Sequence, residues 1–351
     1  MDTIEAEAFR RIYPAEYLAR FLAKGLRPDG RTLLQPRAAT LTLGVVTSAQ
    51  GSALVRLGRT AALAAVKAEI FTPTLDAPAS GAAVICVELP PLCSAELRPG
   101  RSAEACAPLS ARVSAAVEAS RCLPLEQLCV VEAKHAWLLR CDVYILDADG
   151  GLFEAALAAA TAALADTRLP PLAPDLSSPG RLVAVTRGGG GGADADSVGA
   201  GHAASAVLAG GAGRTVRLAS FPAAASVALV SVESAGATSA PAGGCHALVD
   251  PTREEEAVAG CAVSVAVSSS TGHDLCAMLL QCRPGAEDEQ GVIGDEAFVS
   301  AVSAAAKRQR AWTATLAAAG IVVAEAPPPP PAHEPPQPQL QPGGNAEQME
   351  A

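Results

Sequence analysis

The residues best placed to do chemistry lie at a glycine-rich turn near the middle of the chain. An apolar stretch ends at Asp147, Gly150 and Gly151 follow, and an alanine-rich stretch begins directly afterwards. A Gly-Gly turn from a strand into a helix can hold phosphate, because its backbone N–H groups lie at the positive end of the helix. The next two side chains, Leu152 and Phe153, cannot bind an anion. The turn therefore has the backbone of an anion site without the side chains of one.

Acidic residues elsewhere allow more than one interpretation. Asp147 and Asp149 could bind a metal ion together, but aspartates beside a Gly turn more often form the turn and cap the helix, which we favour. The acidic cluster from Asp250 to Glu256 could be the remnant of an acid site, and we interpret it as a solvated loop. None of the ten cysteines forms a C-x-x-C pair, so we predict reduced thiols, no metal site and no cofactor.

The sequence predicts two successive blocks in which strands precede helices. The periodicity of the first block predicts the following elements: a helical segment over 4–24 that Pro14 interrupts, strands over 40–46, 52–57 and 60–70, a helix over 102–120, a strand over 137–146 and a helix over 152–164. Gly58 and Arg59 fit a two-residue hairpin turn. The last helix carries almost only Ala and Leu, which predicts that it packs on two sides.

The second block begins after a stretch rich in Pro, Gly, Ala and Ser. Its predicted elements are strands over 215–219, 226–232 and 246–249, a hairpin from 262–267 to 275–281, and a helix from Asp295 to about Ala319 that Gly320 stops. We divide the chain into a lead-in (1–29), a first half (30–172), a linker and insertion (173–213), a second half (214–320) and a disordered Pro-rich tail (321–351). Two β-then-α halves indicate an α+β fold.

Composition narrows the class of function. Half of the residues are apolar and only 3% are aromatic, so the core must consist of Ala, Val and Leu. The formal net charge is −10, whereas a dedicated nucleic-acid binder usually has a basic excess. Any contact with RNA must therefore come from a local arginine cluster or from a partner. The chain has no run of about 18 apolar residues, so we expect a soluble intracellular protein.

Five short motifs occur in a distinctive order and spacing: Arg27-Pro-Asp-Gly-Arg31, Gly51-Ser-Ala-Leu-Val-Arg-Leu-Gly58, Val66-Lys-Ala-Glu69, Asp147-Ala-Asp-Gly-Gly151 and Asp250-Pro-Thr-Arg-Glu-Glu-Glu256. Together they resemble the RNase PH family, in the form found in the six-membered ring of the eukaryotic RNA exosome. The stretches Leu89-Pro-Pro-Leu-Cys-Ser94 and 13–22 resemble one subunit type of that ring, although sister subunits remain possible. The resemblance implies an RNase PH-like α+β fold, with a ribosomal S5 domain 2-like sheet and helices in two halves.

The resemblance also implies which catalytic groups are missing. Active members cleave RNA from its 3′ end with phosphate as nucleophile, and they carry a Thr-Arg pair where this chain has Leu152 and Phe153. An arginine fork at that position holds the phosphate through two hydrogen bonds. Active members also carry two acidic residues six positions apart, and the matching positions here are Glu256 and Ala262. Alanine can neither donate a proton nor bind a metal ion, so we expect no phosphorolysis and no catalytic residues.

The arginines of the first half are the candidates for contact with RNA. In active relatives, arginines after the third strand line the RNA path and neutralise phosphates without reading bases. On this basis we predict that Arg98, Arg101 and Arg112 bind RNA. Arg27 and Arg31 could also bind RNA, but we favour a role in fixing the N-terminal segment to the core. The basic stretch from Lys307 to Arg310 could be a nuclear signal, and we interpret it as an exposed helix face.

The resemblance implies a structural role in a ring through which RNA is threaded. The expected partners are other RNase PH-like subunits, among them a heterodimer partner resembling ribosomal RNA-processing protein 46, cap proteins with RNA-binding domains, and an associated hydrolytic nuclease. The ring would support rRNA maturation, mRNA turnover and RNA surveillance in the nucleus, including the nucleolus, and in the cytoplasm. The alternative is an active phosphate-dependent exoribonuclease whose site a partner chain completes.

Overall fold

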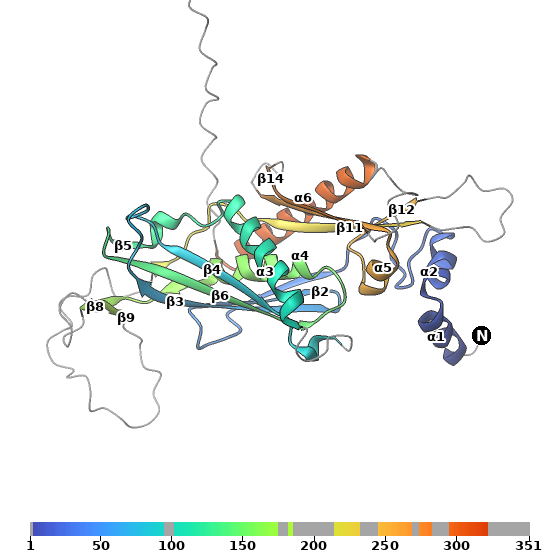
Figure 1. Ribbon diagram of the computed structural model, residues 1–351, viewed down its shortest axis with the longest axis horizontal. Coiled ribbons are helices and arrows are strands. Elements are labelled where there is room, and N and C mark those ends of the chain that lie inside the picture. Colours follow the sequence, from blue (N-terminus) through green and yellow to red (C-terminus); the bar gives the residue numbers. More distant parts are fainter. Residues whose placement is uncertain are drawn as a thin grey trace, which may run out of the picture.

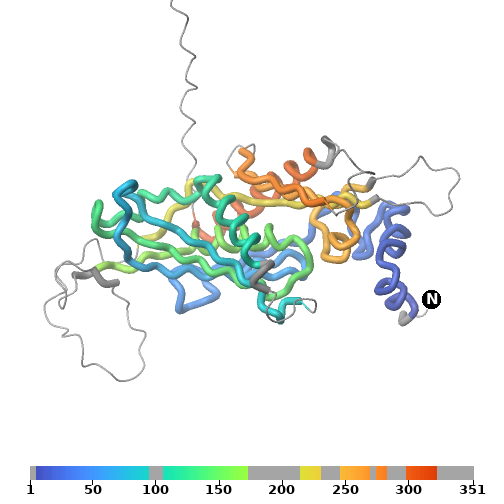
Figure 2. The backbone as a smooth tube through the Cα atoms, viewed as in Figure 1, coloured from blue at the N-terminus to red at the C-terminus, as the bar shows by residue number. Residues whose placement is uncertain are grey.

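A computed structural model describes residues 3–94, 102–174, 182–184, 214–231, 245–268, 274–282 and 295–321. Two β-sheets lie in separate layers, with helices between them (Figure 1). The backbone trace shows that the first half forms one layer and most of the second half the other (Figure 2). In the described part of the chain no helix is long and apolar enough to cross a membrane. The predicted Gly-rich insertion and Pro-rich tail fall outside the described residues, and the proposed domain boundaries stay a prediction.

The first sheet is built on a long central strand pair. Its strands are β1 (Ala39–Leu43), β2 (Gly51–Leu57), β3 (Thr60–Phe71), β4 (Ala82–Glu88), β5 (Cys129–Val131) and β6 (His135–Asp147). The order is β1-β2-β3-β6-β4, and only the β4–β6 pair is parallel. Gly58 has φ +58° at the first turn position between β2 and β3, which confirms the predicted hairpin.

Helix α4 (Leu152–Asp166) lies between the two sheets, and this position explains its unusual composition. Every residue from Phe153 to Ala165 is buried, because the helix packs on β2, β3 and β6 on one side and on β11 of the second sheet on the other (Figure 1). Small Ala side chains allow this close approach on two sides, as the sequence predicts. Helix α3 (Ser102–Ala119) packs against β4 and α4, and Pro108 lies in its interior.

The second sheet has the order β12-β11-β13-β14 and is entirely antiparallel. It comprises β11 (Ala223–Ser231), β12 (Cys245–Val249), β13 (Cys261–Ser268) and β14 (Asp274–Cys282), and helix α6 (Asp295–Ala318) covers one of its faces. Gly320 follows α6 with φ +79°, in agreement with the predicted stop. These elements confirm the predicted α+β class with two β-then-α halves.

Short elements complete the described chain. They are α1 (Thr3–Ile12), α2 (Pro14–Leu22), the 3₁₀ turns η1 (Pro91–Cys93) and η2 (Leu125–Leu128), β7 (Arg168–Leu169), β8 (Leu172–Pro174), β9 (Leu182–Ala184), β10 (Arg214–Thr215) and α5 (Arg253–Val258). The strand predicted over 215–219 is therefore shorter, and regular pairing ends at Thr215.

Helix α5 corrects the prediction of a solvated loop over 250–256. It begins with a capping box, in which Thr252 and Glu255 each bond the other's backbone N–H. Asp250 and Glu255 are buried, at 0% and 2% exposure. Asp250 and Glu255 are therefore part of the interior and pair with buried arginines, whereas Glu254 and Glu256 are exposed.

Candidate functional site

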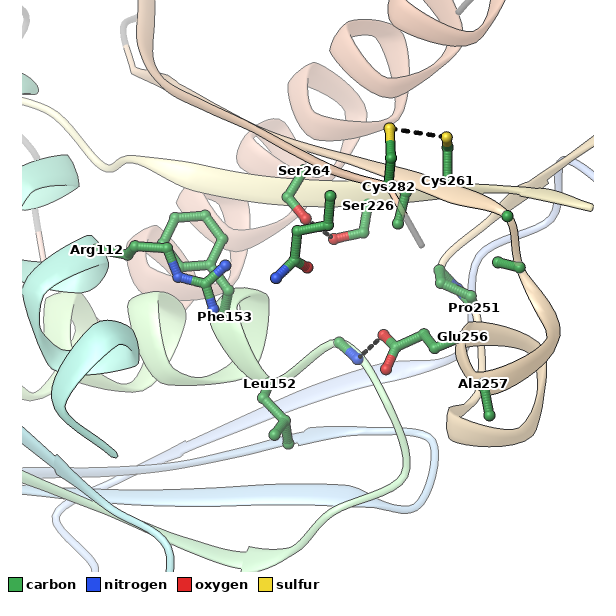
Figure 3. Close-up of a pocket in the computed structure, with 15 residues that line it drawn as sticks. Arg112, Leu152, Phe153, Ser226, Pro251, Glu256, Ala257, Cys261, Ser264 and Cys282 are labelled. Atoms are coloured by element: carbon green, nitrogen blue, oxygen red, sulfur yellow. Dashed lines mark hydrogen bonds between the residues drawn. The ribbon is translucent and has the colours of Figure 1, made fainter. Parts of the chain in front are cut away.

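A cavity of about 420 Å³ opens where the start of α4 meets α3, α5 and the second sheet (Figure 3). Its walls combine the Gly-Gly turn with residues that are distant in the sequence. The polar and sulfur-containing residues of its lining are Arg112, Ser226, Glu256, Cys261, Ser264, Gln281 and Cys282. Leu152, Phe153 and Ala262 line it at positions where active relatives are expected to carry polar groups. Most of the positions that the sequence singled out for phosphate chemistry thus lie around one cavity.

The backbone at the start of α4 requires both glycines. Gly150 and Gly151 have φ +77° and +64°, in the left-handed region that residues with a Cβ rarely adopt. A Cβ at Gly150 would lie 2.6 Å from the carbonyl oxygen of Pro251. The turn therefore presses directly against the segment leading into α5, and the two halves of the chain meet at this point.

The anion position of the turn is occupied by the chain's own carboxylate. The backbone N–H of Gly151 donates to Oε1 of Glu256 at 2.9 Å, across the boundary between the halves (Figure 3). A carboxylate at this end of α4 also interacts favourably with the helix dipole. Although Glu256 as a residue is exposed, desolvation of its carboxyl raises its pKa, and the bond from Gly151 opposes that rise.

Apolar side chains replace the expected phosphate clamp. Phe153 is 7% exposed and lies against Arg112, whose guanidinium carbon is 5.6 Å from the ring centroid. Leu152 is half-buried beside it. Neither side chain can donate a hydrogen bond to an anion, so at these two positions only backbone N–H groups could bind a phosphate.

Arg112 is the RNA candidate that the structure places at this cavity. Its Nε is buried without a hydrogen-bond partner in the described part of the chain, and burial lowers its pKa. Arg98 and Arg101 lie outside the described residues. The assignment of these three arginines to RNA therefore stays a prediction, with Arg112 positioned to present a positive charge to the cavity.

The two positions matched to the catalytic acids line the same cavity. Glu256 stands on α5, and Ala262 stands on β13. Because Ala262 has no donor atom and Glu256 is already bonded to Gly151, this pair does not fit a metal ion. Within the described residues no three His, Cys, Asp or Glu side chains are grouped to hold one.

A buried cluster of four charges lies behind the Gly-Gly turn. Arg37 donates to one oxygen of Asp250 from Nε at 3.0 Å and from Nη2 at 2.6 Å. Arg308 donates to the other oxygen at 2.8 Å and also pairs with Glu154. Arg37 further donates to the backbone carbonyls of Asp149 and Gly150. The cluster thus ties the turn to α4, α6 and the start of α5.

The pKa values of the two carboxyls in the cluster, Glu154 and Asp250, are shifted in opposite directions. Burial raises the pKa of Glu154 to about 7, although Arg308 opposes the rise. Burial would also raise the pKa of Asp250, but Arg308 and Arg37 outweigh it and hold that pKa well below its ordinary value. Asp250 therefore carries the negative charge that both arginines share, and Glu154 is the group that titrates.

Arg308 corrects the interpretation of 307–310 as an exposed helix face. Lys307 and Arg310 are exposed, but Arg308 is only 8% exposed and its guanidinium reaches the interior. Arg27 behaves as favoured from the sequence: it is 1% exposed, pairs with Glu255 and donates to the carbonyl of Val249 at 2.7 Å. It fixes the N-terminal segment to the second half.

Sequence reasoning missed Arg37, Glu154 and Arg308 as members of this site. One signal was available, because Glu154 is the single acidic residue near the start of a helix predicted to be buried on two sides. Such a carboxyl needs a cation or a proton. Nothing in the local sequence identifies Arg37 or Arg308 as its neighbours.

The fold and the cavity define a class of protein. Residues 35–170 match the 3′ exoribonuclease family, domain 1. The architecture matches an exosome of Archaeoglobus fulgidus with RNA bound to its active site, with a TM-score of 0.64 and 23% identity over 89% of this chain and 99% of that one. Residues 35–170 are therefore similar to the RNase PH family, and the described chain shares the fold of that exosome structure.

Curated relatives sharpen this assignment. The chain is 40% identical over 144 residues to exosome complex component Rrp42 of Methanothermobacter thermautotrophicus, which is 41% of this chain and 53% of that protein. It is 35% identical over 162 residues to exosome complex component rrp43 of Schizosaccharomyces pombe, which is 46% of this chain and 60% of that protein. The chain thus spans between half and two thirds of the length of these relatives.

Proposed function

We propose that this protein is a non-catalytic structural subunit of an RNA exosome ring, of the type called ribosomal RNA-processing protein 43. The observation that carries the proposal is the bond from Gly151 to Glu256, which fills the anion position of an RNase PH site with the chain's own carboxylate. Its named relatives are exosome components from archaea and from fission yeast.

The chemistry of the cavity supports the lack of catalysis. Phosphorolysis needs a bound phosphate held in line with the scissile bond and an acid for the leaving group. Here the clamp positions hold Leu152 and Phe153, and one acid position holds Ala262. In this proposal, hydrolysis of RNA is performed by an associated nuclease.

Assembly would give the fold its function. An open sheet has edges and apolar faces that need a partner, and a closed ring leaves none exposed. Exposed apolar side chains on the first sheet, such as Tyr144, Leu146 and Val84, fit this need. The partners would be other RNase PH-like subunits, with a neighbour resembling ribosomal RNA-processing protein 46, and cap proteins. The assembly would work in the nucleus, nucleolus and cytoplasm.

A phosphorolysis assay tests the lack of activity. The purified protein, alone and with its ring partners, is incubated with 3′-labelled RNA and inorganic phosphate, and released nucleoside diphosphates are measured. We expect none. Their appearance, followed by their loss in a Glu256→Gln variant, would overturn the proposal in favour of an active phosphate-dependent exoribonuclease completed by a partner.

Co-purification with mass measurement tests the ring. We expect the tagged chain to bring down a ring-sized assembly of several RNase PH-like subunits. A chain recovered only as a monomer or a homo-oligomer from cells would contradict a ring role, whatever the result of the phosphorolysis assay. Fluorescence imaging of the tagged chain tests the nuclear and cytoplasmic placement.

Substitution of Arg112 tests whether this residue binds RNA. In the assembled ring, Arg112→Ala should weaken RNA binding by a few fold and reduce the salt dependence of binding, because one phosphate contact is lost. Arg98→Ala and Arg101→Ala are tested in parallel. Arg140→Ala on β6 is the matched control, since Arg140 is exposed and does not line the cavity. Equal effects of Arg112→Ala and Arg140→Ala would exclude a specific RNA contact.

A further inference from the structure

Two cysteines face each other across the last two strands of the second sheet. Cys261 on β13 and Cys282 on β14 are direct partners in the antiparallel register, and their sulfur atoms are 2.8 Å apart (Figure 3). A disulfide requires sulfurs about 2.05 Å apart and Cα atoms within about 4.4–6.8 Å. Cross-strand partners already have Cα separations of about 4.5–5.5 Å. The backbone therefore needs little movement to bring the sulfurs into bonding distance.

The two thiols differ in solvent exposure, as a pair requires in which one thiol reacts with the oxidant before the other. Cys282 is exposed, so an oxidant can reach it, whereas Cys261 is buried directly behind it. Cys122 and Cys141, which are buried in the described part of the chain, differ from this pair. Burial raises the pKa of Cys141 to about 12 and that of Cys122 to about 11, which leaves them as unreactive thiols. Cys276, also on β14, directs its sulfur to the carbonyl of Asp274.

We propose that Cys261 and Cys282 form a redox-sensitive pair that hydroperoxides convert to a cross-strand disulfide. The sulfur of Cys282 attacks the outer oxygen of the hydroperoxide, the O–O bond breaks, and the thiol proton goes to the departing alkoxide or hydroxide. Cys282 is then a sulfenic acid. The sulfur of Cys261 displaces its hydroxyl group, which leaves as water with the proton of Cys261. One hydroperoxide is reduced and two thiols are oxidised.

The bond would act on the wall of the cavity and on a sheet edge at once. Both cysteines belong to strands that form a wall of the cavity, and their sulfur atoms lie on the face of the sheet away from Leu152 and Glu256 (Figure 3). Strand β14 is the outermost strand of its sheet in the described part of the chain, and Met278 and Leu280 on it are about half exposed. An edge strand held only by hydrogen bonds can fray. A disulfide at its C-terminal end would fix it to β13.

Thiol mapping tests the pair. The full chain is treated with one equivalent of hydrogen peroxide, remaining thiols are alkylated, and peptides are identified without reduction. We expect a crosslinked peptide joining Cys261 to Cys282 and a loss of two alkylatable thiols per chain. Cys282→Ser should abolish both, and Cys86→Ser, which removes an exposed cysteine on β4, should leave both unchanged.

Two results would overturn the proposal. One is a Cys282 that ends as sulfinic acid with no crosslink while Cys261 stays alkylatable. The other is an equal loss of thiols in the wild-type chain and in Cys282→Ser. Cys261→Ser, checked for folding by circular dichroism, should trap Cys282 as a sulfenic acid that dimedone labels. An unlabelled Cys282 in that folded variant would also contradict the order of steps.

Discussion

The two sides of the Gly150–Gly151 turn differ in the charged side chains that they carry. On the cavity side, the positions expected to hold phosphate carry Leu152 and Phe153, and the turn's N–H bonds Glu256. On the opposite side, Arg37 and Arg308 bind Asp250 with distances of 2.6 and 2.8 Å, and all three side chains are buried. One side carries apolar side chains and one bonded carboxylate, and the other carries a full set of paired charges.

The difference follows from what each charge does for the folded state. A charge that only binds a substrate can be replaced without loss of stability, because water or an apolar side chain takes its place. Removal of one member of a buried ion pair leaves the other uncompensated, at a cost of about 3–5 kcal/mol. The cluster behind the turn joins the two halves of the chain, so its loss would affect the whole fold.

Arg308→Leu should have the largest effect. Asp250 would keep Arg37, but Glu154 would lose its ion-pair partner in the interior. We expect a loss of about 3–5 kcal/mol in the free energy of unfolding, measured by urea denaturation at pH 8. Arg310→Leu, two residues away on the exposed face of α6, should change stability by less than about 0.5 kcal/mol. Equal losses in the two variants would refute the buried cluster.

Glu154→Gln should change the pH dependence of stability. Burial raises the pKa of Glu154 from its ordinary value of 4.5 to about 7, so the folded state binds this proton more tightly than the unfolded state. Stability must therefore fall as the pH rises from about 4.5 to about 7, by up to about 3 kcal/mol. Asp250 has the opposite sign, and its contribution is lost only below pH 3.8.

Thermal unfolding from pH 4 to pH 8 checks this sign. The wild-type chain should lose stability between about pH 4.5 and pH 7, and Glu154→Gln should remove most of that slope. Glu118→Gln on the exposed face of α3 is the control and should retain the wild-type slope. A wild-type chain whose stability rises through pH 5 to pH 7 would show that Arg308 outweighs burial at Glu154.

Restoring the clamp tests the other side of the turn. A variant with Leu152→Thr, Phe153→Arg and Glu256→Gln returns the donors and removes the negative charge beside the N–H of Gly151. It should bind inorganic phosphate and gain about 1.4 kcal/mol of stability at a phosphate concentration ten times its dissociation constant. Glu256→Gln alone should gain nothing from phosphate. Stabilisation of both variants to the same extent would mean that the backbone turn binds phosphate without a clamp.

The helices and strands that have a clear local sequence pattern were predicted well. The β2–β3 hairpin, strand β6 and helix α4 follow from turn chemistry, alternation and the Ala-rich composition. Some of the positions that line the cavity also follow from the motifs, because the Gly-Gly turn and the Asp250–Glu256 stretch carry their own sequence signals. Helix α5 could have been predicted from its capping box, in which Thr252 precedes Glu255 by three residues.

The buried charges could not be predicted in the same way. A basic stretch on a helix is usually solvated, and the partner that buries Arg308 lies 154 residues away on another helix. Arg37 likewise lies 213 residues from Asp250. Ion pairs between elements are determined by how the halves pack, and a local pattern does not contain that information. The dependence on packing also explains why both the 250–256 cluster and the 307–310 stretch were predicted to lie on the surface.

Glu256→Gln should have the smallest effect and decides to which side of the turn Glu256 belongs. Desolvation disfavours its charged form, whereas the bond from Gly151 and the dipole of α4 favour it. Since these effects oppose each other at an exposed residue and glutamine can still accept the bond, we expect a change below about 1 kcal/mol at pH 8. Glu254→Gln, which weakens the exposed pair with Arg10, should have a similarly small effect. A loss above about 2 kcal/mol for Glu256→Gln alone would place Glu256 with the structural cluster, and the carboxylate could then no longer be regarded as a substitute for phosphate.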